Sequence, residues 1–261
     1  MRYGGFTSCV AIAHDGAGAP SLILDAGTGI RRANALFRGG AFAGTILLTH
    51  LHWDHVHGLP FFSAADRDDA RAALFLPEQP DGARATDVLA RAMSPPYFPI
   101  GPEGLRGSWS FDTLAPGVIE AEGFSIEARE IPHKGGRTFG YRVSDGHCVL
   151  AYMPDHCPSV LGVGPDGWGE YHFEAMELAK GADVVVHDAQ MTGEEREAAV
   201  FFGHSVAPYA VGLARRGEAR RVVLFHHSPE RSDDALDELS ERFSADEPEV
   251  IVAAQSLVLE L

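Results

Sequence analysis

Four metal-binding side chains lie within six positions of one another, directly after the apolar run 45–48. A short apolar run of this kind is typical of a buried strand. The segment that follows carries His50, His52, Asp54 and His55. Imidazole and carboxylate groups are ligands that zinc and its neighbours in the periodic table accept. A His-rich polar loop is the plainer alternative, but the spacing favours a metal site at the point where this strand ends.

The order His50-x-His52-x-Asp54-His55 resembles the His-x-His-x-Asp-His signature of the metallo-β-lactamase-fold hydrolases, and the resemblance extends over nearly the whole chain. Later segments are similar to the branch that contains the tRNA 3′-processing endonuclease, ribonuclease Z, and small phosphodiesterases. The resemblance implies an α+β fold of four αββα layers, with two mixed β-sheets between helices. It also implies a metal-dependent hydrolase with a dinuclear centre.

The elements read from the sequence agree with that fold class. Strand-rich halves with helices at intervals are typical of sheets covered by helices. The Pro-rich segment 93–99 is incompatible with regular structure, because three prolines remove donors and fix φ. No linker divides the chain, so we expect one domain over residues 1–261. The expected strands are 21–24, 45–48, 73–76, 118–121, 124–130, 139–143, 148–152, 183–186, 221–225 and 250–252, and the expected helices are 30–37, 81–93, 170–180, 206–215 and 233–243.

The composition of the chain limits the kinds of substrate and partner that we expect. The formal net charge is −16 without a compensating Lys/Arg cluster, which disfavours a large nucleic acid and leaves a small anionic substrate as the expected partner. Three cysteines form no paired motif, as in proteins of a reducing compartment. No apolar run of 18 residues and no signal peptide is present, so we expect a cytoplasmic protein without a membrane partner. A homodimer is compatible with the sequence.

The resemblance extends the metal site beyond the first four side chains. His133 matches the histidine that joins His50 and His52 at the first ion. Asp155 takes the position of the Asp that bridges two ions. The last ligand follows the apolar strand 221–225, where His226 and His227 compete. The family pattern of strand, His, one residue and Ser selects His226.

Asp25 is a candidate for orienting a ligand. A metal-binding histidine usually donates its second ring nitrogen to an acceptor behind it. Asp25 ends the strand expected beside the ligand strand, so it is placed to accept from His50 or His52. Capping of the turn that contains Gly27 is the alternative role, and the two roles are compatible.

Asp188 and His204 are candidates for acid–base catalysis. The stretch 187–190, His-Asp-Ala-Gln, is similar to the His-Glu-Ala-Thr stretch of ribonuclease Z, whose acidic residue orients a distant histidine. Here Asp188 takes the acidic position, and His204 matches the distant histidine. A histidine held by a carboxylate can protonate a leaving oxygen. A structural histidine packed over a helix end is the alternative for His204.

Together these features favour a dinuclear phosphodiesterase. Two divalent ions, with Zn²⁺ expected and Mn²⁺ or iron as alternatives, would share Asp155 and a bridging hydroxide that Asp54 aims at phosphorus. Only the 27 residues 156–182 separate Asp155 from Asp183, which leaves little room for the arm that grips tRNA in ribonuclease Z. We therefore expect a small phosphodiester such as a cyclic nucleotide, and Tyr97 and Phe98 are candidates for the pocket wall.

Three alternatives remain open. A lactone or thioester hydrolase of the same fold would need the His204 and Asp188 pair less. A tRNA 3′-processing-like endonuclease conflicts with the acidic charge. A non-catalytic, metal-stabilised binding protein conflicts with the intact ligand set.

Overall fold

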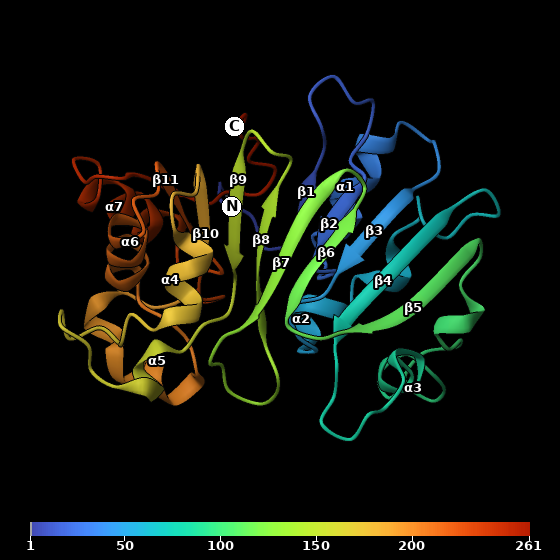
Figure 1. The fold of residues 1–261 in the computed structure, drawn as a ribbon, viewed down its shortest axis with the longest axis horizontal. Helices are drawn as coiled ribbons and strands as arrows, with labels where there is room; N and C mark the ends of the chain where they lie inside the picture. The colour runs from blue at the N-terminus through green and yellow to red at the C-terminus, as the bar shows by residue number, and fades with distance from the viewer. Residues whose placement is uncertain (1) are drawn as a thin grey trace. The chain divides into compact units, whose positions relative to one another are not determined.

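The computed structural model describes residues 2–261, which form two compact units. One unit comprises Phe6–Ala115, and the other comprises residues 2–5 together with Pro116–Leu261. Each unit is built around its own mixed sheet (Figure 1). The expected α+β class with two mixed sheets is confirmed, whereas the single domain expected over 1–261 stays a prediction.

The Phe6–Ala115 unit contains a five-stranded sheet in the order β1-β2-β3-β4-β5. The β1–β2 pair is antiparallel and the other three pairs are parallel. Its strands are β1 (Val10–Ile12), β2 (Leu22–Leu24), β3 (Ala43–Leu47), β4 (Arg71–Pro77) and β5 (Ser108–Leu114). Its helices are α1 (Ile30–Ala33), α2 (Trp53–Val56) and α3 (Ala85–Ala90), with short 3-10 turns at Asn34–Phe37, Leu59–Phe61 and Pro102–Gly104.

The central strands of this unit are apolar because both of their faces are covered. All three residues of β2 are buried, as are the last four of β3. Phe37, Phe42 and Phe62 pack edge to face or tilted in the same core, with ring centroids 5.2 to 5.7 Å apart. This packing holds the end of β3, which leads into the candidate metal-binding segment His50–His55.

The larger unit contains a seven-stranded sheet in the order β12-β11-β10-β9-β8-β7-β6. Strands β9 to β12 run parallel, and β6 to β9 are joined by antiparallel pairs. The strands are β6 (Gly117–Ala121), β7 (Phe124–Glu130), β8 (Phe139–Ser144), β9 (Val149–Met153), β10 (Val184–Asp188), β11 (Arg221–Phe225) and β12 (Glu249–Val252). Its helices are α4 (Phe173–Ala179), α5 (Arg196–Phe202), α6 (Ala207–Arg216) and α7 (Asp233–Arg242), with 3-10 turns at Pro158–Leu161 and Gly193–Glu195.

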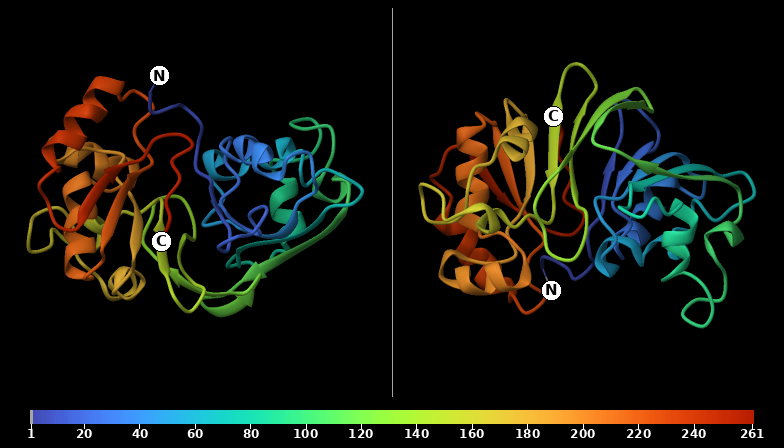
Figure 2. Two further views of the ribbon diagram at one scale, coloured as in Figure 1. Left: turned by 90° about the horizontal axis from the view of Figure 1, so that it is seen from above. Right: turned by 60° about the horizontal axis from the view of Figure 1, so that its bottom comes forward.

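Helices α4 and α6 pack on the same face of this sheet. They contact each other, and they contact strands β7 to β9 and β10 to β11 respectively. Figure 2 shows these yellow and orange helices beside the strands of their unit. Leu178 of α4, Tyr209 and Leu213 of α6 and Val185 of β10 share one buried apolar core.

The parallel strands of each sheet bring candidate residues to one edge. Asp155 follows β9, Asp188 ends β10, and His226 follows β11, all at the carboxyl ends of neighbouring strands. In the other unit, Asp25 follows β2 and His50 lies just beyond β3. Because the carboxyl ends of parallel strands meet at one edge, this topology gathers polar side chains that are distant in sequence.

The sequence did not predict β1, β5 or α5. Strand β5 lies at a sheet edge with mostly exposed or half-buried residues, so its hydrophobic signal is weak. The absence of regular structure over 93–99 is confirmed. Among residues 2–261, no helix combines the length and the apolar character needed to cross a bilayer.

Candidate metal centre

The His50–His55 segment turns from a strand end into a helix start. His50 lies three residues beyond β3, and helix α2 begins at Trp53. The rings of His50 and His52 have centroids 4.5 Å apart, and those of His50 and His55 are 4.2 Å apart. Nε2 of His55 lies 3.5 Å from Oδ2 of Asp54. This unit therefore gathers three imidazoles and a carboxylate around one turn of chain.

Asp25 lies fully buried behind these ligands and accepts from two neighbours. Nδ1 of His55 donates to Oδ2 of Asp25 at 2.8 Å, and the Thr49 amide donates to Oδ1 at 2.7 Å. The Thr49 hydroxyl also donates to the carboxylate, at 2.9 and 3.0 Å. Because this hydroxyl gives its proton to Asp25, it accepts from Nδ1 of His50, which is 3.1 Å away.

The sequence led us to expect that Asp25 accepts from His50 or His52, and this stays a prediction. The structure shows His55 donating to Asp25 and His50 linked to it through Thr49. The reason is local: α2 turns the chain and brings His55 back over the end of β2. In both His50 and His55 the Nδ1–H is engaged, so Nε2 is the nitrogen able to bind an ion.

Close backbone packing holds this turn. A Cβ atom on Gly27 would lie 2.0 Å from the carbonyl oxygen of Asp54, and a Cβ on Gly58 would lie 1.9 Å from the carbonyl oxygen of Gly27. The Gly58 amide donates to the Ala26 carbonyl at 2.8 Å. Only residues without a side chain allow the loop after β2 to approach α2 this closely.

In the larger unit, one carboxylate lies between two imidazoles. Nε2 of His133 is 3.4 Å from Oδ2 of Asp155, and Nε2 of His226 is 3.4 Å from Oδ1 of the same residue. Nδ1 of His133 donates to the carbonyl oxygen of Gly203 at 2.6 Å. Burial lowers the pKa of His133, although Asp155 opposes this effect, so the neutral form that a metal ligand requires is favoured.

His226 and His227 diverge after β11. His226 adopts a left-handed backbone conformation, with φ of 58°, and turns its ring toward Asp155. Nε2 of His227 instead donates to the carbonyl oxygen of Ala253 at 3.2 Å, and burial lowers the pKa of His227 to about 4. Of the two candidates, His226 is the one near the carboxylate.

Gln190 contacts His226 from behind. Its Nε2 lies 3.1 Å from Nδ1 of His226, so the amide donates to the ring in this orientation. Metal ligation through Nε2 of His226 needs the other tautomer, with a proton on Nδ1. A half turn of the Gln190 amide would present its oxygen to that proton.

His204 and Asp188 form a hydrogen-bonded pair in which Asp188 is buried and His204 is partly exposed. Nδ1 of His204 lies 2.9 Å from Oδ2 of Asp188, which also accepts the backbone amides of His156 and Ser205 at 3.0 and 3.2 Å. Burial lowers the pKa of His204, but the Asp188 carboxylate outweighs burial, and the net effect raises it. One donor atom each from Asp155, His204 and His226 lie within 4.8 Å of one another. The pair is therefore adjacent to the candidate ligands of its own unit.

The residues present fit divalent metal ions in each unit considered by itself. One unit offers imidazole Nε2 atoms whose tautomers are fixed by Asp25 and Thr49. The other offers Asp155 with an imidazole Nε2 near each oxygen, a donor set suited to Zn²⁺, Mn²⁺ or iron.

Comparison with known proteins agrees with this chemistry. A model of the beta-lactamase superfamily domain matches residues 21–227. The chain belongs to this superfamily.

Two kinds of relative extend the comparison. Ribonuclease Z from Natronomonas pharaonis is 25% identical over 268 residues, covering 87% of this chain and 83% of the relative. The metallo-β-lactamase fold protein YhfI from Bacillus subtilis superposes with a TM-score of 0.70 at 16% identity, covering 99% of this chain and 95% of YhfI. A diphosphatase from the PhnP family has a TM-score of 0.64 at 18% identity, covering 97% of this chain and 83% of that one. The metallo-β-lactamase fold is thus confirmed, and the chain is a hydrolase of this superfamily.

Several supporting residues of this superfamily member were not singled out from the sequence. Thr49 links His50 to Asp25, Gln190 contacts His226, and Gly203 accepts from His133. Thr49 directly precedes the predicted ligand His50, and Gln190 lies two residues after the predicted catalytic residue Asp188. Both follow the end of a strand, and this position could have identified them as supporting residues. Gly203 gave none, because its partner is 70 positions away.

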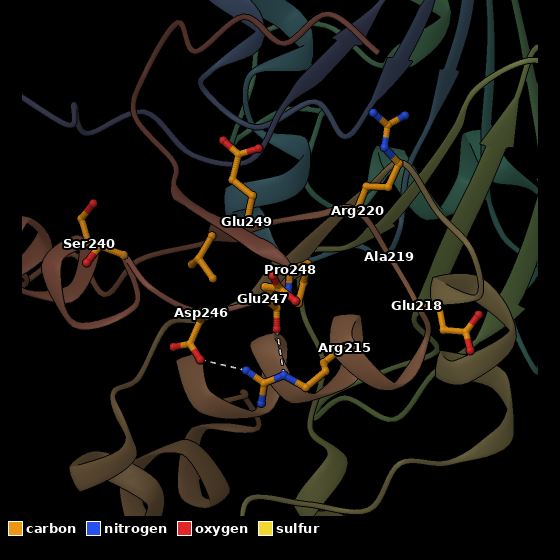
Figure 3. Close-up of a pocket in the computed structure, with 11 residues that line it drawn as sticks. Arg215, Glu218, Ala219, Arg220, Ser240, Asp246, Glu247, Pro248 and Glu249 are labelled. Carbon is orange, nitrogen blue, oxygen red and sulfur yellow. Dashed lines mark hydrogen bonds and ion pairs between the residues drawn. The ribbon is translucent and has the colours of Figure 1, made fainter.

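A surface hollow in the larger unit lacks the chemistry of the metal centre. It measures about 900 Å³ and is lined by the end of α6 and the start of β12 (Figure 3). Arg215 donates to Asp246 and to the carbonyl oxygen of Glu247, both at 2.8 Å, and Arg220 donates to Asp183 at 2.9 Å. Its cations are thus already paired, and it contains none of the predicted site residues.

Cys157 is buried elsewhere in this unit, with Sγ 3.5 Å from the Ser159 hydroxyl.

Proposed function

We propose that this protein hydrolyses a small phosphodiester, such as a cyclic nucleotide, with the help of two divalent metal ions. The observation that carries the proposal is the 2.9 Å contact between His204 and Asp188, beside Asp155 and His226. A phosphodiester needs a nucleophile, neutralisation of charge and a proton for the departing alkoxide. The relatives named ribonuclease Z and diphosphatase support phosphoryl chemistry.

The residues that would hold the ions are His50, His52, Asp54 and His55 in one unit and His133, Asp155 and His226 in the other. We take Zn²⁺ as the expected metal. When bound, such ions supply a hydroxide nucleophile at neutral pH and offset the charge of the phosphate oxygens.

The chain's own residues perform the remaining steps. Asp54 would accept a hydrogen bond from the attacking nucleophile and orient it toward phosphorus. As the new P–O bond forms, the bond to the leaving oxygen breaks, and Nε2–H of His204 donates its proton to that oxygen. Nδ1 of His204 remains against Asp188, whose carboxylate stabilises the protonated ring and favours its reprotonation after each turnover.

The size of the substrate is inferred from charge and chain length. Between β9 and β10 lie only one 3-10 turn, a loop and the seven-residue helix α4, so no long arm protrudes there. The net charge of −16 repels a polyanion. Both features favour a small diester over tRNA, although the relatives named ribonuclease Z keep a tRNA 3′-processing-like activity as the second candidate.

We also expect the protein to be located in the cytoplasm.

The proposal is tested with protein loaded separately with Zn²⁺ and Mn²⁺, with metal content quantified. Hydrolysis of bis(p-nitrophenyl) phosphate is compared with that of the monoester, a thioester and a lactone. We expect diester turnover at about two metals per chain and its loss in Asp54→Asn. Asp68→Asn, which alters an exposed carboxylate in the same unit, is the matched control. Thioester or lactone turnover without diester turnover would overturn the proposal in favour of ester chemistry, and no turnover of any ester would favour the non-catalytic alternative.

A further inference from the structure

Three consecutive apolar side chains at the end of α5 are unusually exposed. Val200, Phe201 and Phe202 expose 43%, 66% and 55% of their surface. The two phenyl rings form a T-shaped pair with centroids 5.0 Å apart. Single exposed apolar residues are ordinary, but adjacent aromatic side chains beside polar site residues are typical of a binding surface.

This aromatic pair is attached to the candidate site through Lys134. The ammonium group of Lys134 donates to the carbonyl oxygen of Phe201 at 2.7 Å and lies 4.8 Å from the centroid of the Phe201 ring. Lys134 directly follows His133. A Cβ atom on Gly203 would lie 2.4 Å from Cβ of Lys134, so the end of α5 and the segment after β7 are in tight contact.

The same contact orients both histidines of the site in this unit. His133 donates to the carbonyl oxygen of Gly203, the left-handed residue that ends α5. His204 comes next in the chain, and its ring centroid is 5.1 Å from that of His133. The exposed rings of Phe201 and Phe202 therefore lie two or three positions from the proposed proton donor and on the segment that orients a proposed ligand.

We propose that Phe201, Phe202 and Lys134 form a platform that binds a nucleobase of the substrate. The inference rests on the proposed function and specifies its substrate class as a nucleoside-containing phosphodiester. Aromatic side chains stack on any base through its π face. Lys134 covers one face of Phe201, yet two thirds of that side chain stays exposed, so the rest of its ring is open to a base.

Lys134 contributes charge in a chain that carries few cations. A lysine ammonium group has three donors, and the Phe201 carbonyl occupies one of them. The remaining donors suit a phosphate or ribose oxygen of a ligand stacked on Phe201. Lys134 is thus suited to the phosphate group of a nucleotide, and the adjacent Phe201 ring is suited to its base.

The test compares two cyclic esters that differ only in the base. Adenosine 3′,5′-cyclic phosphate is the first, and methyl riboside 3′,5′-cyclic phosphate, in which a methoxy group replaces the base, is the second. For the metal-loaded wild type we expect kcat/KM to be about tenfold or more higher with the nucleotide, mainly through KM, as loss or gain of one stacked base implies. Phe201→Leu and Phe202→Leu should lower kcat/KM for the nucleotide much more than for the base-free ester, and so remove most of that preference.

Two further variants separate the contributions. Lys134→Met, which keeps the apolar stem, should lower kcat/KM for both esters by a similar factor. Phe173→Leu alters an aromatic residue on α4 that is 65% exposed and lies under Arg129, and it should change neither. Circular dichroism and metal content verify that each variant is folded and loaded.

The outcomes distinguish the platform from the proposed function. Equal kcat/KM for the two esters in the wild type, or an unchanged preference in both Leu variants, would overturn the platform while leaving phosphodiester hydrolysis intact. Turnover of bis(p-nitrophenyl) phosphate without either cyclic ester would also overturn it. Loss of a dimer in the Leu variants, with base preference retained, would assign the patch to contact between copies instead. Absence of all diester turnover would overturn the proposed function and the platform with it.

Discussion

Nδ1 of His55 donates to the carboxylate of Asp25 across 2.8 Å, and neither side chain is exposed to solvent. Asp25 adopts a left-handed backbone conformation, with φ of 61°, directly after β2. This conformation turns its carboxylate toward the end of β3, where Thr49 also donates to it. One acidic residue thereby fixes the ring orientation of His55 directly and that of His50 through the Thr49 hydroxyl.

Asp25→Asn is expected to weaken metal binding about 10- to 100-fold. The amide replaces one accepting oxygen with a donor, while Thr49 and His55 still present donors to it. Competition with a chromophoric chelator measures the affinity. Asp15→Asn, at an exposed position of the same unit, should leave the affinity unchanged. Metal binding by Asp25→Asn as tight as that of the wild type would contradict the orienting role.

His204→Ala is expected to lower kcat about 10²- to 10⁴-fold for an ester with an alkoxide leaving group, with metal content retained. The loss should be much smaller for a p-nitrophenyl ester, whose leaving oxygen needs no proton. Asp188→Asn should follow the same pattern. The exposed His147→Ala is the control. Equal losses for both leaving groups would exclude proton donation by His204.

Stability is expected to fall as the pH drops below about 6.5, the ordinary pKa of histidine. Burial lowers the pKa of His187, whose Nδ1 donates to the Asp188 carbonyl at 2.8 Å, so the folded protein keeps this ring neutral. The unfolded chain takes up the proton first, which favours unfolding by up to about 1.4 kcal/mol per pH unit for this residue. The stability that the neutral His187 ring contributes to the folded state is complete above pH 6.5. It is lost as the pH falls from 6.5 toward the lowered pKa of His187.

Thermal unfolding at pH 7.5 and 5.5 checks this expectation. The difference in Tm between the two pH values should be smaller in His187→Asn than in the wild type, because the variant has one fewer buried histidine. The same substitution at the exposed His147 should leave the difference unchanged. An identical pH dependence in wild type and His187→Asn would show that His187 does not couple folding to protonation.

Gly58→Ala is expected to lower the free energy of unfolding by about 1 to 3 kcal/mol. Its Cβ would lie 1.9 Å from the Gly27 carbonyl oxygen, and the three nearest atoms all belong to the backbone of Ala26 and Gly27, so no flexible side chain can move aside. Gly18→Ala is the matched control, because a Cβ there meets nothing within 4 Å. Urea unfolding gives both values. Equal stability of the two variants would contradict the close approach of the loop after β2 to α2.

Sequence patterns predicted the buried parallel strands well. Strand β11 agrees at both ends and β10 within two residues, because apolar runs between polar segments mark strands covered on both faces. Strand β5 was missed because an edge strand is only partly buried. Helix α5 was missed because its apolar residues face solvent instead of forming a stripe toward the core.

For the candidate site, residue types were easier to predict than partners. The positions of His204 and Asp188 followed from a family motif, and the structure brings them to 2.9 Å. The contact of His55 with Asp25 depends on how α2 turns after His52, which no local pattern specifies. The divergence of His226 and His227 likewise depends on a left-handed residue at the end of β11.

Asp25 and His226 share that left-handed conformation, each at the first position after a parallel strand. For residues with a side chain it costs on the order of 1–2 kcal/mol, whereas glycine adopts it freely. Selection for heat resistance alone would therefore favour glycine at both positions and remove the functional groups in doing so. Glycine at either position would thus raise thermal stability and lower activity. A laboratory evolution experiment for stability should therefore keep both residues unchanged.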